Sequence, residues 1–291
     1  MAKYFVAYPI SYDCNLRCDY CFHREHHENN YAEKRIFTVS DWCRFRDTHL
    51  KDAEDILVHF HGGETFLPTN INTICSFMRQ TTMERVDFLT NGIQDPKHYR
   101  RMLEFNDRIH RIGFTFHRKM IRDVPQLVEA FERNVYMVRD MGIPLYVKEL
   151  LFVDLRDETL EAKRRWESEG IQFKIQDFKG YDRGRDFAEF QRYEARDYLY
   201  IDSEYKRGGA YCACVKGYKN ILIRGHWNDG DVLACFEDGT VVGNIQQNWY
   251  HPGYKVYKDF DKGRIDVIGV PKLYRGTYDR DLYKPGQCGS N

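Results

Sequence analysis

Apolar segments of strand length alternate with amphipathic segments of helix length over the first 178 residues of the chain. The segments with the composition of buried strands are residues 3–10, 55–61, 85–92, 111–117, 144–152 and 171–178. Helical patterns lie between these segments, and Ser40 is the expected N-cap of the first helix. A second helix is expected over about 70–83, and Gly142 is expected to end the longest helix. Repeated strand–helix units predict parallel strands joined by right-handed crossovers. The chain is therefore predicted to be an α/β protein whose core is a (β/α)6 partial TIM barrel.

The alternation of residues along each predicted strand indicates which side chains face the interior of the barrel. Helices outside the barrel should cover the apolar set, which in residues 55–61 is Ile56, Val58 and Phe60. The alternate residues, which should point inward, are His59, His61, Gly113, Thr115, His117, Tyr146, Lys148, Gln172, Lys174 and Gln176. A closed structural barrel would carry branched aliphatic residues at these positions, so we expect a polar substrate cavity. The assignment depends on register, because a slip by one residue would exchange the two faces.

The composition excludes several classes of protein. Hydrophobic residues make up 42% of the chain and aromatic residues 15%, which excludes disorder as the dominant state. Lys and Arg number 44, as do Asp and Glu, and this balance disfavours a nucleic-acid partner. No apolar run approaches the roughly 18 residues of a membrane span, and the apolar stretch at the N-terminus is too short for a signal peptide. We therefore expect a cytoplasmic protein with no membrane partner.

Nine cysteines are unexpected in the cytoplasm, where disulfides are rare. Cys14, Cys18 and Cys21 form a C-x3-C-x2-C run directly after the first predicted strand. Three thiolates in one loop can converge on one soft metal centre, whereas a zinc site would normally have four protein ligands in paired knuckles. On a 4Fe–4S cluster, three cysteine ligands leave one iron open to a substrate or cofactor. Cys43 and Cys75 stand alone in helical patterns and are expected to be core residues.

Two motifs resemble those of radical S-adenosylmethionine (radical SAM) enzymes. CNLRCDYC is similar to the cluster loop of that family, with Tyr20 at its aromatic position, and HGGE at 61–64 resembles the Gly-Gly-Glu motif at the end of the second strand. The resemblance covers roughly residues 3–180. It implies that Cys14, Cys18 and Cys21 bind a 4Fe–4S cluster, and that the amino and carboxylate groups of S-adenosylmethionine chelate the open iron.

The resemblance also implies how the chain would bind this cofactor. Gly62 and Gly63 would let the backbone approach the methionine moiety, Glu64 would accept a hydrogen bond from its ammonium group, and a backbone group of Tyr20 would meet the adenine edge. Thr115 is the expected ribose contact. Lys148 or His117 is expected to pair with the cofactor carboxylate, although each is equally suited to bind substrate. An external electron donor of the flavodoxin or ferredoxin type would reduce the cluster. Electron transfer from the reduced cluster would cleave a carbon–sulfur bond of S-adenosylmethionine, and the resulting 5′-deoxyadenosyl radical would abstract hydrogen from the substrate.

A second group of cysteines follows the point near residue 180 where the strand–helix pattern stops. The spacing from Cys214 to Cys235 resembles the start of the SPASM and Twitch extensions of radical SAM enzymes, and two short strands flank Phe236–Thr240, whose Asp-Gly signals a hairpin. The further cysteines of a SPASM domain are missing, so one auxiliary 4Fe–4S cluster is the maximum. Its ligands would be Cys214, Cys235 and some of Cys212 and Cys288; the alternative is ordinary cysteines in a small β-subdomain. We expect residues 1–185 to form the barrel and residues 186–291 a β-hairpin and helix subdomain.

Two classes of function follow from these patterns. The leading hypothesis is a radical SAM enzyme of the oxidoreductase or lyase type that oxidises or rearranges a small polar metabolite. In an oxidation, the second cluster would take an electron and Lys148 or Lys174 would remove a proton. Modification of a ribosomally made peptide ranks lower, because a motif that begins at residue 14 leaves no room for an N-terminal peptide-recognition domain. The other class is a non-catalytic iron–sulfur electron carrier or sensor, which would need neither the Gly-Gly-Glu motif nor the barrel.

Overall fold

A parallel β-sheet forms the centre of the computed structural model, which describes residues 2–18, 20–21, 38–177, 219–223, 230–234, 240–259 and 264–268. Its amino-terminal strands are β1 (Ala2–Ser11), β2 (Ala53–Gly62), β3 (Glu84–Thr90), β4 (Ile109–Phe116), β5 (Leu145–Leu151) and β6 (Gln172–Asp177). These strands are adjacent in chain order, and every neighbouring pair is parallel. The predicted α/β fold with a parallel sheet is therefore confirmed, and the arrangement is consistent with a partial barrel.

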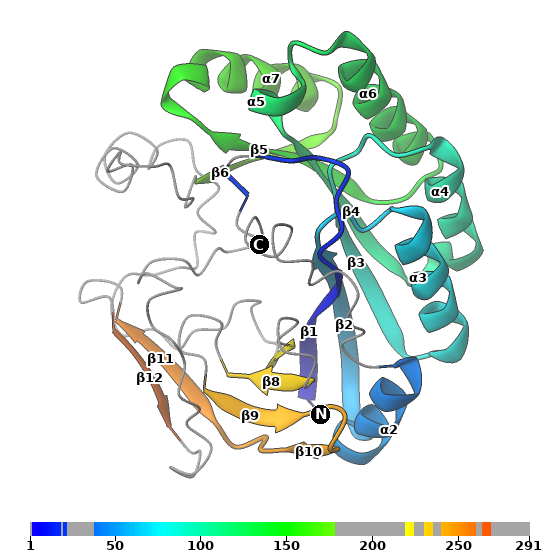
Figure 1. Cartoon of the computed structure of the whole chain (residues 1–291), viewed down its shortest axis with the longest axis vertical. Helices are drawn as coiled ribbons and strands as arrows, with labels where there is room; N and C mark the ends of the chain where they lie inside the picture. The colour runs from blue at the N-terminus through cyan, green and yellow to red at the C-terminus, as the bar shows by residue number, and fades with distance from the viewer. Residues whose placement is uncertain are drawn as a thin grey trace.

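Helices cover the outer side of the curved sheet (Figure 1). They are α2 (Val39–His49), α3 (Pro68–Gln80), α4 (Pro96–Arg100), α5 (Arg118–Ile121), α6 (Pro125–Asp140) and α7 (Arg156–Ser168), with 3₁₀ segments η2 (Arg101–Arg108) and η3 (Val153–Leu155). Among the described residues, no helix combines the length and the apolar character needed to cross a bilayer.

The ends of the helices follow local capping chemistry. Gly142 ends α6 with a φ of +73°, as predicted, and its amide donates to the carbonyl of Arg139 at 2.8 Å. The prediction of Ser40 as N-cap of α2 is wrong: Thr38 caps this helix through a capping box, in which its hydroxyl accepts from the Asp41 amide and the Asp41 carboxylate accepts from the Thr38 amide.

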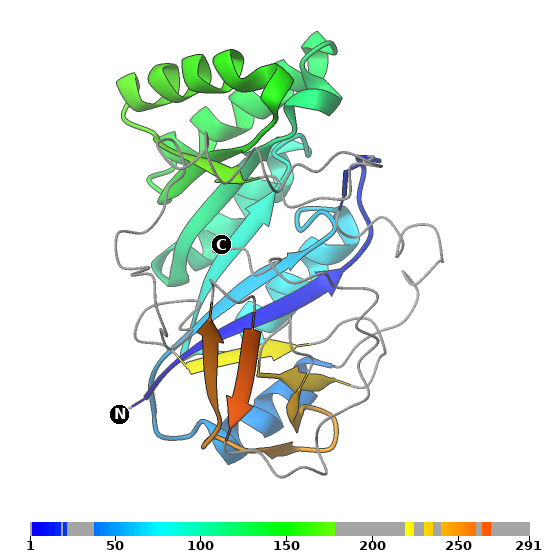
Figure 2. The same ribbon diagram turned by 90° about the vertical axis from the view of Figure 1, so that its left-hand side faces the viewer.

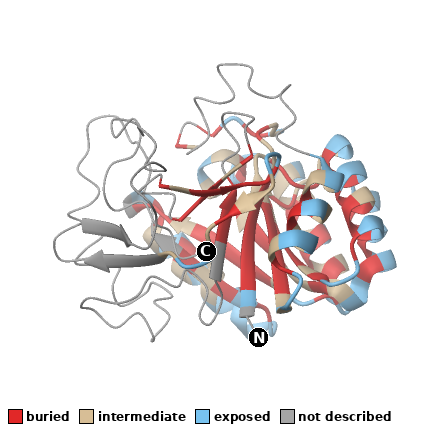
Figure 3. Cartoon of the chain, turned by 90° about the horizontal axis from the view of Figure 1, so that it is seen from below, coloured by how far each residue is buried: buried red, intermediate tan, exposed pale blue. Residues whose placement is uncertain are grey.

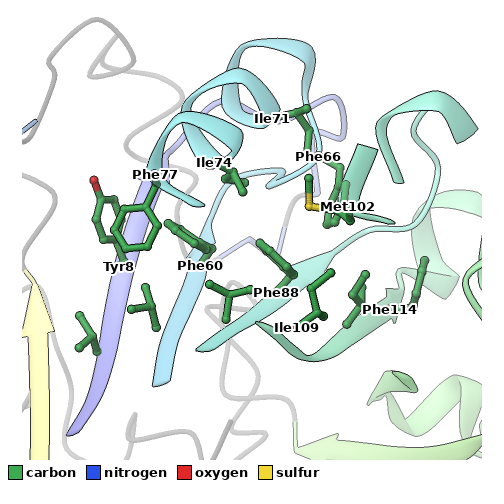
Figure 4. Packing of buried hydrophobic residues seen from close by; sticks show 14 of the residues in the cluster. Tyr8, Phe60, Phe66, Ile71, Ile74, Phe77, Phe88, Met102, Ile109 and Phe114 are labelled. Carbon is green, nitrogen blue, oxygen red and sulfur yellow. The ribbon is translucent and has the colours of Figure 1, made fainter. Parts of the chain in front are cut away.

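Aromatic residues on the outer face of the sheet form the core with the helices. Phe60 on β2 contacts Phe77 of α3 with ring centroids 5.2 Å apart, and Phe114 on β4 contacts Phe131 of α6 at 6.0 Å. Figure 4 shows Phe60, Phe88 and Phe114 in a row along the sheet, with Ile71 and Ile74 of α3 above it. Buried residues run along the strands, while the helices expose their outer surfaces (Figure 3). The helix-facing set includes Ile56, Val58 and Phe60, which confirms the predicted strand register.

Strands from the carboxyl-terminal part of the chain extend the same sheet past β1. Strand β7 (Lys219–Ile223) pairs with β1 in parallel, and β8 (Asp231–Leu233), β9 (Val241–Asn244) and β10 (Trp249–Tyr250) follow as antiparallel neighbours (Figures 1 and 2). A small apolar cluster on the inner face joins them to the barrel, with Phe5, Ala7 and Leu57 packed against Leu222 and Leu233. A separate antiparallel pair is formed by β11 (Lys255–Asp259) and β12 (Arg264–Ile268).

The predicted hairpin strands on either side of Phe236–Thr240 correspond to β8 and β9, which pair antiparallel. Four predicted auxiliary-cluster ligands, Cys212, Cys214, Cys235 and Cys288, lie outside the described residues. The predicted domain boundary at residue 185 also lies outside them and stays a prediction.

Candidate active site

The three clustered cysteines lie in the loop that follows β1, at the carboxyl end of the parallel sheet. Cys18 is buried, Cys14 and Cys21 are half-buried, and all three are free thiols. The loop is held by local hydrogen bonds: the Cys21 amide donates to the carbonyl of Cys18 at 3.1 Å, and the Leu16 amide donates to the Sγ of Cys14 at 3.4 Å. Burial raises the pKa of Cys14 to about 11, although the Leu16 amide acts in the opposite direction. Without a metal this thiol is therefore protonated at neutral pH.

The chemistry of this donor set suits an iron–sulfur cluster. Three soft thiols from one loop are the ligand type that such clusters use. Within the described ranges, no three His, Cys, Asp or Glu side chains converge on the position of a single metal ion. The loop therefore supplies the type of ligand that an iron–sulfur cluster uses.

The Gly-Gly-Glu segment at the end of β2 lies directly against the cysteine loop. The Gly63 amide donates to the carbonyl of Ser11 at 2.8 Å, and the Glu64 amide donates to that of Asp13 at 2.7 Å. A Cβ atom at Gly62, whose φ is +127°, would lie 2.1 Å from the Ser11 carbonyl oxygen, and one at Gly63 would lie 2.0 Å from that of Asp13. Both glycines are therefore required for the close approach of the two loops. Their predicted role toward the methionine moiety stays a prediction.

Glu64 connects the ends of β2 and β3 inside the protein. Its fully buried carboxylate accepts hydrogen bonds from the Phe66 amide at 2.8 Å, the Thr90 hydroxyl at 2.7 Å and the Asn91 amide at 2.7 Å. Burial raises the pKa of Glu64 to about 7, although these three hydrogen bonds act in the opposite direction. The hydrogen bond that Glu64 is expected to accept from the cofactor ammonium stays a prediction. The contacts of its carboxylate with Phe66, Thr90 and Asn91 hold the ends of β2 and β3 together.

Asn91 links this carboxylate to the cysteine loop and was missed by the sequence analysis. Its side-chain amide donates to the Oδ1 of Asn15 at 2.7 Å and reaches the Sγ of Cys14 at 3.8 Å. The predicted strand 85–92 included Asn91, whereas β3 ends at Thr90 and leaves Asn91 at the carboxyl end of the sheet. A polar Thr-Asn-Gly sequence directly after an apolar strand was the available signal.

His117 and Tyr20 contact each other beside the cysteine loop. His117 lies just past the end of β4, at the N-cap of α5, and its Nδ1 is 3.2 Å from the Tyr20 hydroxyl and 3.8 Å from the Sγ of Cys18. The two rings are stacked, with centroids 6.1 Å apart. Burial and the nearby Lys148 ammonium lower the pKa of His117 to about 4. The structure thus brings two predicted cofactor contacts together with one predicted iron ligand.

Thr115, Lys148 and Lys174 form a row across the inner face of β4, β5 and β6. Thr115 pairs in register with Lys148, and Lys148 with Lys174. Lys148 is only 9% exposed, whereas Lys174 is half-buried with its Nζ 4.0 Å from the centroid of the Tyr146 ring. Burial, Lys174 and Arg111 lower the pKa of Lys148 to about 8, and Asp87 partly offsets them. The predicted inward orientation of both lysines fits this row.

A second inward group consists of His59, which was predicted to face inward, and of Asp87 and Arg111, which the sequence analysis missed. Register places His59 opposite Asp87 and Asp87 opposite Arg111. The Nδ1 of His59 lies 3.5 Å from one carboxylate oxygen of Asp87, and the Nε of Arg111 lies 3.0 Å from the other. Burial alone would raise the pKa of Asp87, but His59 and Arg111 outweigh it and hold that pKa below its usual range. The alternation that identified His59 also places Asp87 and Arg111 inward when it is extended to residues 85–92 and 111–117.

Solved structures of other proteins share the fold of this chain. A structure of anSMEcpe with bound AdoMet is similar in fold, with a TM-score of 0.58, 14% sequence identity, and coverage of 85% of this chain and 76% of that chain. Structures of anSMEcpe with AdoMet and a Cp18Cys or Kp18Cys peptide have TM-scores of 0.57 and 0.56, each with 13% identity and coverage of 84% and 78%. At this identity the likeness concerns the fold alone.

The sequence comparisons identify the family. No curated protein matches the sequence. The Radical SAM superfamily, however, matches residues 8–164, more than half of the chain, and this region contains the cysteine loop, the Gly-Gly-Glu segment and Lys148 of the inward row. The chain therefore belongs to the Radical SAM superfamily, whose members are enzymes that generate radicals from S-adenosylmethionine.

Proposed function

We propose that this protein is a radical SAM enzyme of the oxidoreductase or lyase type that oxidises or rearranges a small polar metabolite. The observation that carries the proposal is that one sheet holds both the candidate cofactor residues and a row of polar side chains. The cysteine loop and Glu64 lie at the carboxyl ends of β1 and β2, and the polar side chains of Thr115, Lys148 and Lys174 line the inner face of β4–β6. A parallel barrel places its chemistry at this end of the strands.

Cofactor binding is assigned to residues around the cysteine loop. Cys14, Cys18 and Cys21 would hold a 4Fe–4S cluster, and Gly62, Gly63, Glu64, Tyr20 and Thr115 would bind S-adenosylmethionine, with Lys148 or His117 near its carboxylate. When bound, the cluster and S-adenosylmethionine supply a 5′-deoxyadenosyl radical that abstracts hydrogen. The protein's part is to hold the thiols in a partly buried loop, to orient the substrate and to exclude water. The burial of Cys18 and Glu64 supports such an environment.

An auxiliary 4Fe–4S cluster is the second part of the proposal. Cys214, Cys235 and some of Cys212 and Cys288 would bind it, and an oxidation would use it to accept the second electron. Lys148 or Lys174 would then accept the proton, and an external flavodoxin or ferredoxin would reduce the radical cluster. Iron counting after anaerobic reconstitution tests this part: about eight irons per chain are expected, and about four would exclude the second cluster.

Peptide modification is the second candidate function. Solved structures with the same fold contain a bound Cp18Cys or Kp18Cys peptide, which favours an inner face able to receive a peptide. Incubation of the reduced enzyme with short cysteine-containing peptides, followed by mass spectrometry, separates the two. A mass change in a peptide would favour this candidate over a small metabolite.

Formation of 5′-deoxyadenosine by the reconstituted, reduced protein with S-adenosylmethionine tests the enzyme assignment itself. The wild-type protein should form it, and Cys18→Ala should abolish it. Cys43→Ala is the matched control, because Cys43 is a half-buried thiol on α2, away from the loop. Retained iron–sulfur absorbance without 5′-deoxyadenosine would support the alternative of a non-catalytic electron carrier or sensor.

A further inference from the structure

Two lysines lie side by side on the inner face of the sheet. In the parallel register of β5 and β6, Lys148 is directly opposite Lys174. Both side chains therefore project from the same face of adjacent strands. Like charges at opposite positions of neighbouring strands repel and destabilise a sheet. The repulsion between these two ammonium groups is therefore unfavourable for the stability of the sheet.

The deeper lysine has no acidic partner in the described part of the chain. Lys148 is 9% exposed, and none of the described carboxylates lies within ion-pair distance of its ammonium group. The carboxylate that acts on it electrostatically, Asp87, is already engaged by Arg111 at 3.0 Å and approached by His59 at 3.5 Å. Burying an ammonium group without a partner costs free energy.

The surroundings add positive charge instead of removing it. The guanidinium carbon of Arg111 lies 5.2 Å from the centroid of the Tyr146 ring, and the Nζ of Lys174 lies 4.0 Å from the same centroid. Tyr146 extends over Gly113 on β4, where a Cβ would lie 2.5 Å from the tyrosine hydroxyl. One aromatic ring thus lies close to two cations on the inner face. Lys174 and Arg111 both make it harder to keep Lys148 charged.

We propose that Lys148 and Lys174 together bind a carboxylate of the substrate. The two oxygens of a carboxylate can each accept a charge-assisted hydrogen bond from one ammonium group. The Thr115 hydroxyl, next to Lys148 in the same row, can donate a further one. A bound carboxylate would relieve the repulsion between the lysines and supply a partner that the ammonium group of Lys148 lacks among the described residues.

This inference rests on the proposed function only in taking the inner face of the barrel as the substrate side. S-adenosylmethionine also has a carboxylate, so the experiment must distinguish the two sources. Succinate is a suitable probe, with succinamide as an uncharged compound of similar size. Calorimetric titrations would use the reconstituted protein saturated with S-adenosylmethionine, whose own dissociation constant is measured separately. The variants are Lys148→Met and the less buried Lys174→Met, which provides a second test if the first fails to fold.

The matched control is Lys163→Met, which removes a surface lysine of α7 that pairs with Glu167. Succinate should bind wild-type protein and Lys163→Met about tenfold more tightly than succinamide. Each of the other two variants should lose this preference. Equal binding of both probes to wild type, or a preference retained in Lys148→Met and Lys174→Met, would overturn the proposal.

A weaker binding of S-adenosylmethionine to Lys148→Met, with the succinate preference unchanged, would assign the lysine to the cofactor and would also overturn it. Formation of 5′-deoxyadenosine is measured in the same samples. Succinate preference without 5′-deoxyadenosine would support the carboxylate site and refute the proposed function. Formation of 5′-deoxyadenosine without the preference would refute the carboxylate site alone.

Discussion

Replacing Gly63 by alanine should separate the two loops that form the candidate active site. The added Cβ would lie 2.0 Å from the carbonyl oxygen of Asp13, and neighbouring atoms essentially never approach a Cβ closer than 3.0 Å. The loops must therefore move apart by about 1 Å, which is the difference between 3.0 Å and 2.0 Å. Two backbone hydrogen bonds span the same gap, from the Gly63 amide to Ser11 at 2.8 Å and from the Glu64 amide to Asp13 at 2.7 Å.

If both bonds are lost, each unsatisfied amide costs about 1–3 kcal/mol, so the variant should lose about 2–6 kcal/mol of unfolding free energy. That is a large fraction of the roughly 5–15 kcal/mol that stabilises a typical domain. The assay is urea unfolding of the metal-free, reduced protein, followed by measurement of iron per chain after reconstitution. Gly253→Ala is the matched control, because a Cβ added at Gly253 would meet no atom within 4 Å and the φ of this residue needs no glycine. Equal stability and equal iron content in the two variants would refute the proposed loop contact.

Three further predictions concern the barrel. Lys148 has an ordinary pKa of 10.5 and a pKa of about 8 in the folded protein, so the unfolded chain binds more protons between these values. The unfolding free energy of the wild-type protein should therefore rise relative to that of Lys148→Met between pH 8 and 10.5, by up to about 3 kcal/mol. The measurement is urea unfolding of both proteins at several pH values, and a difference that stays constant with pH would contradict this prediction. Phe88→Ala should lower the unfolding free energy by about 3–5 kcal/mol, since the ring is fully buried. Met83→Ala, at a residue that is 52% exposed, should change it by less than about 0.5 kcal/mol. Similar melting temperatures of the two variants would be evidence against the described core. Thr38→Ala should lower the unfolding free energy by about 1 kcal/mol through loss of the capping box, and Ser40→Ala should not; the opposite order would restore Ser40 as the cap.

Strand positions and their two faces were predictable because each rests on a short-range pattern. The alternation that placed Phe60 toward the helices and His59 toward the interior is set by the pleat of one strand, and burial on both sides leaves little freedom of register. The cysteine loop was equally accessible, since its three thiols lie within eight residues of sequence.

Contacts between strand ends were not predictable, because they join residues far apart in sequence. The carboxylate of Glu64 meets Thr90 and Asn91 only after β2 and β3 are paired. Gly63 carried a motif signal, but its closest contact, the Asp13 carbonyl, is a property of the folded loops. The pairing of β7 with β1 joins opposite parts of the chain and has no local sequence pattern.

The N-cap of α2 shows a different limit. Ser40 and Thr38 are both residues that cap helices well, so residue type alone did not choose between them. The deciding feature is Asp41, three residues after Thr38, whose carboxylate accepts from the Thr38 amide at 2.9 Å. A complete search for capping boxes would have identified the helix start from the sequence.

The enzyme assignment depends on the binding of S-adenosylmethionine to the open iron of a cluster held by Cys14, Cys18 and Cys21. The most direct measurement is electron–nuclear double resonance of the reduced cluster with S-adenosylmethionine labelled with ¹⁵N at its amino group. The protein used would carry alanine in place of Cys212, Cys214, Cys235 and Cys288, so that any signal comes from the first cluster. We expect a ¹⁵N coupling to the cluster. A reduced cluster with S-adenosylmethionine bound but no nitrogen coupling would exclude binding of its amino group to the open iron.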